Sequence, residues 1–154
     1  MFSIVLSASL FAALSGSTMD GFQVLESGDA DLFAFCIASV DEKPVFSWDL
    51  MEPEAVVRFG NKVRQLDIPK SWGDREELAK DDHGQTFART TFVMGGFAGT
   101  SWAGDGGSVI FEETSPSEEI AREESDSRKI YHMKMTGTFS EQADTIYVRI
   151  DCGL

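Results

Sequence analysis

Residues 130–152 have the sequence IYHMKMTGTFSEQADTIYVRIDC, and this stretch decides the fold. Apolar and polar residues alternate along both halves, with a polar turn at residues 140–144 between them. Alternation with a period of two is typical of a strand that buries one face. The stretch therefore predicts an antiparallel hairpin. Its predicted core-facing residues are Tyr131, Met133, Met135, Ile146, Val148, Ile150 and Cys152.

Further strands are predicted upstream of this hairpin. Residues 32–40 (LFAFCIASV) form a nearly continuous apolar run, which favours a central strand buried on both faces. Residues 45–50 alternate, with Phe46, Trp48 and Leu50 on one face. Residues 85–94 and 109–113 are rich in β-branched and aromatic types and also predict strands.

Residues 52–68 fit two structures. Val56, Phe59 and Val63 recur at helical spacing, whereas Gly60 and Asn61 form the dipeptide of a two-residue hairpin turn. A glycine followed by an asparagine destabilises a helix interior by more than about 1 kcal/mol. We therefore favour a hairpin over a helix here.

Residues 71–80 predict one short helix. Asp74 is placed to cap its first turn, and Glu77 follows three residues later as in a capping box. The glycine-rich stretch at residues 94–108 predicts a loop or a tight bend.

Residues 112–128 contain seven acidic residues against two arginines, and a Ser-Pro-Ser sequence interrupts them. This composition predicts an exposed loop, with one helical turn at residues 117–124.

These elements together predict a mainly β fold. Seven or eight strands with at most one short helix are typical of an antiparallel sandwich or a small barrel, and an α+β arrangement is the alternative. A chain of 154 residues suits a single domain, which we place at residues 18–154.

The first 17 residues predict a signal peptide. Residues 2–14 carry no charge, are too few to span a bilayer, and precede small residues at Ser15 and Ser17 that suit a cleavage site. The basic residues that usually open a signal peptide are missing, so an uncleaved anchor or a buried first helix is the alternative. We expect an exported protein, periplasmic or extracellular, with no membrane insertion after cleavage.

The two cysteines, Cys36 and Cys152, are too far apart in sequence for a CxxC redox pair or a local zinc site. Both lie in predicted core strands, and an exported protein meets an oxidising environment. We predict a structural disulfide between them, with two buried free thiols as the alternative.

The formal net charge is −13, and the lysines and arginines are scattered along the chain. Such a surface repels phosphate backbones, so nucleic acid is excluded as an expected partner. An unknown ligand or a basic protein fits better. Asp29 and Asp31 have the first spacing of a calcium loop without its remaining ligands, and we predict no metal and no cofactor.

Large aromatic residues lie in the predicted loops. Phe97, Trp102 and the acidic Asp105 belong to the glycine-rich stretch, and Trp72 lies near another turn. Exposed aromatic rings offer flat apolar area to a glycan or a small ligand, so we predict these four residues as the ligand-binding site. The alternative is that the rings fold back onto the core.

Three functional hypotheses follow. The first is a non-catalytic binding or interaction module for a glycan, a small ligand or an envelope protein, because no catalytic motif is present. The second is an envelope hydrolase that uses carboxylates such as Asp82, with His83. The third is a structural accessory subunit whose acidic residues 112–128 contact a basic partner.

Overall fold

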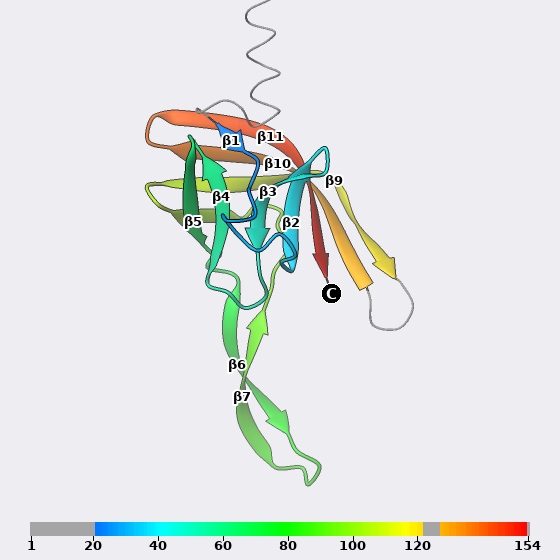
Figure 1. Ribbon diagram of the computed structural model, residues 1–154. Helices are drawn as coiled ribbons and strands as arrows, with labels where there is room; N and C mark the ends of the chain where they lie inside the picture. Colours follow the sequence, from blue (N-terminus) through cyan, green and yellow to red (C-terminus); the bar gives the residue numbers. More distant parts are fainter. Residues whose placement is uncertain (1–20, 122–126, 154) are drawn as a thin grey trace, which may run out of the picture.

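The computed structural model describes residues 21–121 and 127–153, and this part of the chain consists of strands and turns without a helix (Figure 1). The predicted signal peptide, residues 1–17, lies outside the described residues. None of the described segments is a helix of the length and hydropathy that crossing a membrane requires. The strands are β1 (Phe22–Gln23), β2 (Cys36–Val40), β3 (Lys43–Trp48), β4 (Glu54–Phe59), β5 (Lys62–Asp67), β6 (Gly73–Lys80), β7 (Thr86–Val93), β8 (Ser101–Gly104), β9 (Gly107–Ala121), β10 (Ser127–Phe139) and β11 (Gln142–Gly153).

Eight of the strands close into an antiparallel barrel. In the order β2-β3-β4-β5-β8-β9-β10-β11, each strand pairs with the next, and β11 pairs with β2 to complete the circle. The short β1 adds to β4. The prediction of a mainly β antiparallel fold is confirmed, and the barrel is the form it takes. Between β5 and β8, strands β6 and β7 form a separate two-stranded sheet that projects from the barrel (Figure 1).

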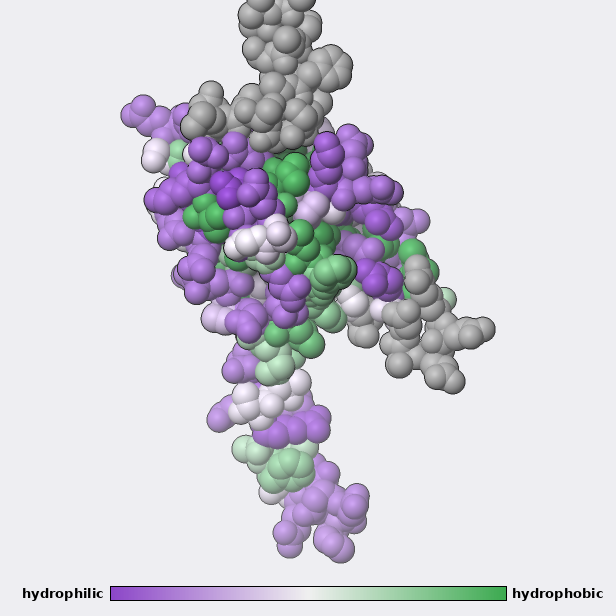
Figure 2. Space-filling model, viewed as in Figure 1, coloured by the Kyte–Doolittle hydropathy of each residue, from purple (hydrophilic) through white to green (hydrophobic). Residues whose placement is uncertain are grey.

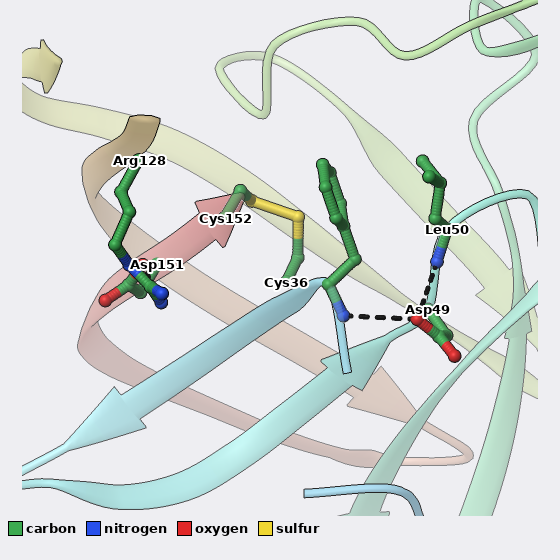
Figure 3. Close-up of a disulfide and its surroundings, with 7 residues drawn as sticks. Cys36, Asp49, Leu50, Arg128, Asp151 and Cys152 are labelled. Atoms are coloured by element: carbon green, nitrogen blue, oxygen red, sulfur yellow. Dashed lines mark hydrogen bonds and ion pairs between the residues drawn. A yellow bond between two sulfur atoms is a disulfide. The ribbon is translucent and has the colours of Figure 1, made fainter. Parts of the chain in front are cut away.

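The seam between the first and last barrel strands carries the disulfide. Cys36 and Cys152 are register partners, with Cα atoms 4.2 Å apart and the sulfurs bonded (Figure 3). Beside them, Arg128 Nε donates a hydrogen bond of 2.7 Å to Asp151 Oδ1. The predicted bridge is confirmed. The alternating pattern of β11 places Cys152 on the same side of the strand as its apolar neighbours, where Cys36 can reach it.

Aromatic rings fill the barrel. The ring of Phe46 is central, with its centroid 5.1 Å from Trp102 and 5.3 Å from Phe111 in edge-to-face arrangements. Such ring pairs contribute about 0.5–1.5 kcal/mol beyond the area they bury. The largest fully buried side chains are Trp48, Trp102, Phe46, Phe59, Phe97, Phe111, Phe139, Leu66, Ile130, Met133, Met135 and Ile150.

Two hairpins predicted from the sequence are confirmed. Strands β4 and β5 flank a turn in which Gly60 and Asn61 have φ angles of 62° and 59°, the left-handed pair that a type I′ turn requires. The C-terminal hairpin pairs β10 with β11 along their whole length, from Arg128 to Phe139. Its turn is shorter than predicted, because β11 already begins at Gln142.

The predicted helix at residues 71–80 is wrong. Residues 73–80 form strand β6, which pairs in register with β7 from Gly73 opposite Val93 to Lys80 opposite Thr86. The capping pattern of Asp74 and Glu77 is a local preference only, and the segment has no apolar stripe at helical spacing to bury against the core. Pairing with the β-prone residues of β7 therefore outweighs it.

The predicted acidic loop at residues 112–128 is also wrong over most of its length. Strand β9 continues to Ala121 and pairs with β10, with a register irregularity between Ile130 and His132 that accommodates the Ser-Pro-Ser sequence. The predicted helical turn at residues 117–124 falls on strand residues at 117–121 and on residues 122–124, which lie outside the described part. Cross-strand pairs such as Lys134 with Glu112, 3.5 Å apart, offset the acidity of β9.

Two smaller predictions are corrected as well. Strand β2 begins only at Cys36, and residues 32–35 form a turn, so the central strand is shorter than predicted and only Cys36 and Ala38 are fully buried. Within the glycine-rich stretch, Ser101–Gly104 form β8, because Gly104 lets β5 approach: an added Cβ there would lie 2.2 Å from the Gln65 carbonyl oxygen.

Candidate binding site

The arm, which we define as residues 73–93, is a long and largely exposed part of the described chain. Among the described residues, strands β6 and β7 pair only with each other (Figure 1). Almost all of their side chains lie in solvent. An isolated two-stranded hairpin is only marginally stable in water. Contacts at the base, the middle and the tip of the arm must therefore hold it in place.

The base of the arm is anchored in the aromatic core. The ring of Phe92 stacks on Trp48 at a centroid distance of 6.0 Å and an interplanar angle of 22°. Trp72 immediately precedes β6 and lies 5.3 Å from Trp48 and 5.0 Å from Trp102. The arm is thus attached rigidly where it leaves the barrel.

A charged pair links the two strands in the middle of the arm. Arg89 Nε donates a hydrogen bond of 2.6 Å to Glu77 Oε1, and Thr91 Oγ1 donates one of 3.1 Å to the same oxygen. The hydrogen bond from Arg89 is the main cause that lowers the pKa of the Glu77 carboxyl, with a smaller effect from Thr91. Both partners are exposed, so this pair orients the strands and adds little stability.

The tip of the arm is a turn ordered by Asp81. Asp81 Oδ1 accepts hydrogen bonds of 2.9 Å from the backbone N–H groups of His83 and Gln85. Gly84 has a φ of 76°, which an L side chain rarely adopts. The tip is therefore preorganised, and His83 belongs to a turn between strands rather than to the end of a helix.

Each face of the arm presents one large apolar side chain. Leu78 is 78% exposed and Phe87 is 44% exposed. Phe87 is the register partner of Ala79, so Leu78 lies on the opposite face. Figure 2 shows the apolar residues of the arm between the barrel and a hydrophilic tip. These two side chains lie apart on opposite faces, so the arm carries single apolar side chains rather than one continuous apolar patch.

A hollow of about 640 Å³ lies at the base of the arm. It is built by the segments that lead into β6 and out of β7, so the arm and the hollow share one end of the barrel. Asp67 and Lys70 bring opposite charges to it. The lining residues are Asp67, Ile68, Pro69, Lys70, Ser71, Gly95, Gly96, Ala98, Gly99, Thr100, Ser101 and Ala103.

Three of the four predicted ligand-binding residues come together, but inside the core. Trp72, Phe97 and Trp102 are 5%, 0% and 0% exposed, and the rings of Phe97 and Trp102 stack 5.8 Å apart. None of the three lines the hollow. As placed, the rings fill the barrel, which is the alternative that the sequence left open, and their role in ligand binding stays a prediction.

The polar atoms of these rings are only partly paired. Trp102 Nε1 donates to Thr100 Oγ1 at 3.1 Å, and that hydroxyl donates to the Phe97 carbonyl at 2.7 Å. Trp72 Nε1 is buried and has no hydrogen-bond partner within the described residues. It lies so close to Gly95 that an added Cβ there would approach it to 2.6 Å.

The fourth predicted residue, Asp105, lies in the turn between β8 and β9. Its carboxylate accepts a hydrogen bond of 2.7 Å from the Gln65 N–H, and its carbonyl accepts one of 3.1 Å from Arg64. These contacts tie the turn to β5. Asp105 therefore holds the β8–β9 turn against β5. It does not join the aromatic group.

The residues proposed for a hydrolase do not form a cleft. Asp82 and His83 are exposed at the tip of the arm. The other histidine, His132, pairs with Glu118 on the barrel at 2.9 Å, and both side chains are open to solvent. Residues 21–121 and 127–153 bring together no group of three or more His, Cys, Asp or Glu side chains that could hold a metal ion.

Sequence reasoning missed the arm. Its second strand was predicted, and residues 82–84 carry a turn signal, but the competing helix at residues 71–80 hid the hairpin. One further signal was present: residues 83–104 contain no acidic side chain, in a chain with a net charge of −13. No protein-family model, curated protein or solved structure matches this chain.

Proposed function

We propose that this protein is a non-catalytic interaction module of an exported compartment, and that it contacts another protein through the arm. The observation that carries the proposal is the two-stranded arm itself. Within the described residues, no other strand pairs with the outer edge of β6 or of β7. Unpaired strand edges offer a row of backbone donors and acceptors to a strand of a partner.

The construction of the arm supports a recognition role. Its base is fixed in the core by Phe92 and its tip is ordered by Asp81, so little conformational entropy is lost when a partner binds. Leu78 and Phe87 add apolar anchors on the two faces. A segment that only connected β5 to β8 would need neither the projecting strands nor the exposed apolar residues.

The barrel supports the same proposal as a scaffold. Its interior is filled by side chains such as Phe46, Trp102 and Phe111, so we place binding outside the barrel, on the arm. The disulfide fits an oxidising compartment, where such bridges form and persist. On this ground, export of the chain is part of the proposal.

Site-specific photocrosslinking in the producing cells tests the proposal. A photoreactive phenylalanine replaces Leu78 on the arm or, as a control, Tyr147, which is 68% exposed on the barrel strand β11. We expect a discrete protein adduct from position 78 and none from position 147. The absence of an adduct at position 78, or equal adducts at both positions, would refute an interaction through the arm.

A further inference from the structure

The outer edge of β7 has a defined set of free backbone groups. The Asp81 N–H donates to the Gln85 carbonyl at 2.9 Å, which makes these two residues a hydrogen-bonded pair of the ladder. Hydrogen-bonded and non-hydrogen-bonded pairs alternate along an antiparallel ladder. The N–H and C=O groups that point away from β6 therefore belong to Thr86, Ala88, Thr90 and Phe92.

The same edge carries no acidic residue, although the chain as a whole is strongly acidic. Residues 83–104 contain no acidic residue, and β7 carries only Arg89 as a charged side chain. The acidic residues of the arm's strands, Asp74, Glu76 and Glu77, all lie on β6. A strand that approaches β7 from outside is therefore kept apart from them by the width of the ribbon.

From these observations we infer that two copies of this chain associate through their arms, with β7 of one copy pairing antiparallel to β7 of the other. This inference rests on the proposed function and names its partner. The product is a four-stranded ribbon in the order β6-β7-β7-β6, with a two-fold axis perpendicular to it. Both acidic β6 strands then occupy the outer positions.

The side chains of β7 select one register. The outward-pointing residues of one copy must face those of the other, which leaves two registers that each pair seven of the eight residues of β7. The first places Arg89 opposite Arg89 of the second copy, and like charges directly opposite are destabilising. The second places Thr90 opposite Thr90, and Arg89 then faces a threonine, Thr91.

The second register also pairs the apolar side chains. Phe87 lies opposite Val93 of the second copy, and Ala88 lies opposite Phe92. Aromatic and β-branched residues opposite each other on antiparallel strands contribute about 0.2–1 kcal/mol per pair. Backbone hydrogen bonds, apolar pairs and the absence of like-charge contacts thus agree on one self-complementary arrangement.

The length of the arm limits the repulsion between the two barrels. In this register residues 87–93 of the two copies pair, and these seven residues span roughly 23 Å at about 3.3 Å per residue. The barrels lie at opposite ends of the ribbon, about three Debye lengths apart at physiological salt. Their negative charges are therefore largely screened. The interface is small, so we expect a dimer that forms reversibly in the micromolar range.

Sedimentation and light scattering on the full chain test the inference with two proline variants. Thr90→Pro removes the outward N–H at the centre of the self-pair and leaves the β6–β7 hydrogen bonds intact. Glu76→Pro is the matched control, because Glu76 is the register partner of Thr90 and its N–H points to the opposite edge. Circular dichroism and the mid-point of urea unfolding confirm that both variants fold.

We expect the apparent mass of the wild type and of Glu76→Pro to double between about 1 and 100 µM protein, and Thr90→Pro to stay monomeric. In the wild type, the amides of Ala88 and Thr90 should gain protection from hydrogen exchange over this range, whereas those of Phe87, Arg89 and Thr91 should not change. A wild type that is monomeric throughout, or a Thr90→Pro variant that dimerises equally well, overturns the inference.

The outcome also separates this inference from the proposed function. A monomeric wild type whose arm crosslinks to a different protein overturns self-pairing and leaves the interaction module standing. A monomeric wild type without any arm adduct removes both. An adduct of twice the mass of the chain supports both.

Discussion

Removal of the disulfide should destabilise the protein by about 5 kcal/mol. Cys36 and Cys152 are separated by 116 residues, and the chain-entropy relation for a loop of that length gives about 4.8 kcal/mol at 25 °C. Alanine at both positions is the suitable change, because both side chains are fully buried and serine would bring two hydroxyl groups into the core. This loss would be a large fraction of the stability of a domain of this size.

Removal of the disulfide should also loosen the seam between β2 and β11 locally, in addition to lowering the free energy of unfolding. The two strands pair only from Ser39 opposite Arg149 to Cys36 opposite Cys152, whereas β10 and β11 pair along their whole length. Without the bridge, the barrel should open first at this short seam. We therefore expect the amides of the paired β2 residues to exchange faster with solvent, while those of β10 change little.

Urea unfolding of the oxidised wild type and of the Cys36→Ala/Cys152→Ala variant measures the loss. With a slope of about 2 kcal/mol per molar urea, the mid-point should fall by more than about 2 M. A reducing agent should lower the mid-point of the wild type and leave that of the double variant unchanged. A loss of less than about 1 kcal/mol in a variant that still folds would refute the loop-entropy argument, and free thiols in the purified protein would refute the bridge.

Two further predictions concern the core and a half-buried ion pair. Trp102→Ala should destabilise the protein by about 3–5 kcal/mol in urea unfolding, whereas Leu78→Ala should cost less than about 0.5 kcal/mol. Equally small losses for both variants would argue against a core role of Trp102 and favour its predicted role in ligand binding. Asp29 accepts a hydrogen bond of 2.7 Å from Arg58, which is the main cause that lowers the Asp29 pKa. The ion pair therefore stabilises the fold by about 1–3 kcal/mol above the unfolded pKa of about 3.9, and this stabilisation disappears as the pH falls through the lower folded pKa. If the wild type and Asp29→Asn lose stability in parallel from neutral to acid pH, this expectation is contradicted.

The candidate site shows where sequence reasoning stopped. The rings of Trp72, Phe97 and Trp102 lie together, but a loop position in sequence says nothing about which way a ring points. The barrel turns all three rings inward because its interior needs large apolar side chains to reach close packing. The arm was missed because the strand propensity of β6 is weak and depends on β7, which begins six residues after β6 ends.

The sequence by itself determined the strands that carry their own signals. The alternation in residues 130–152, the left-handed Gly60-Asn61 turn and the pairing of the two cysteines are local or unique features, so each was predictable without knowledge of the neighbours.

Only the tertiary structure decided that the strands close into a barrel, that residues 73–80 form a strand, and that β9 extends to Ala121. Each of these depends on a partner strand and on which face is buried against it. A strand has no hydrogen bonds of its own, so its extent is set by what lies beside it.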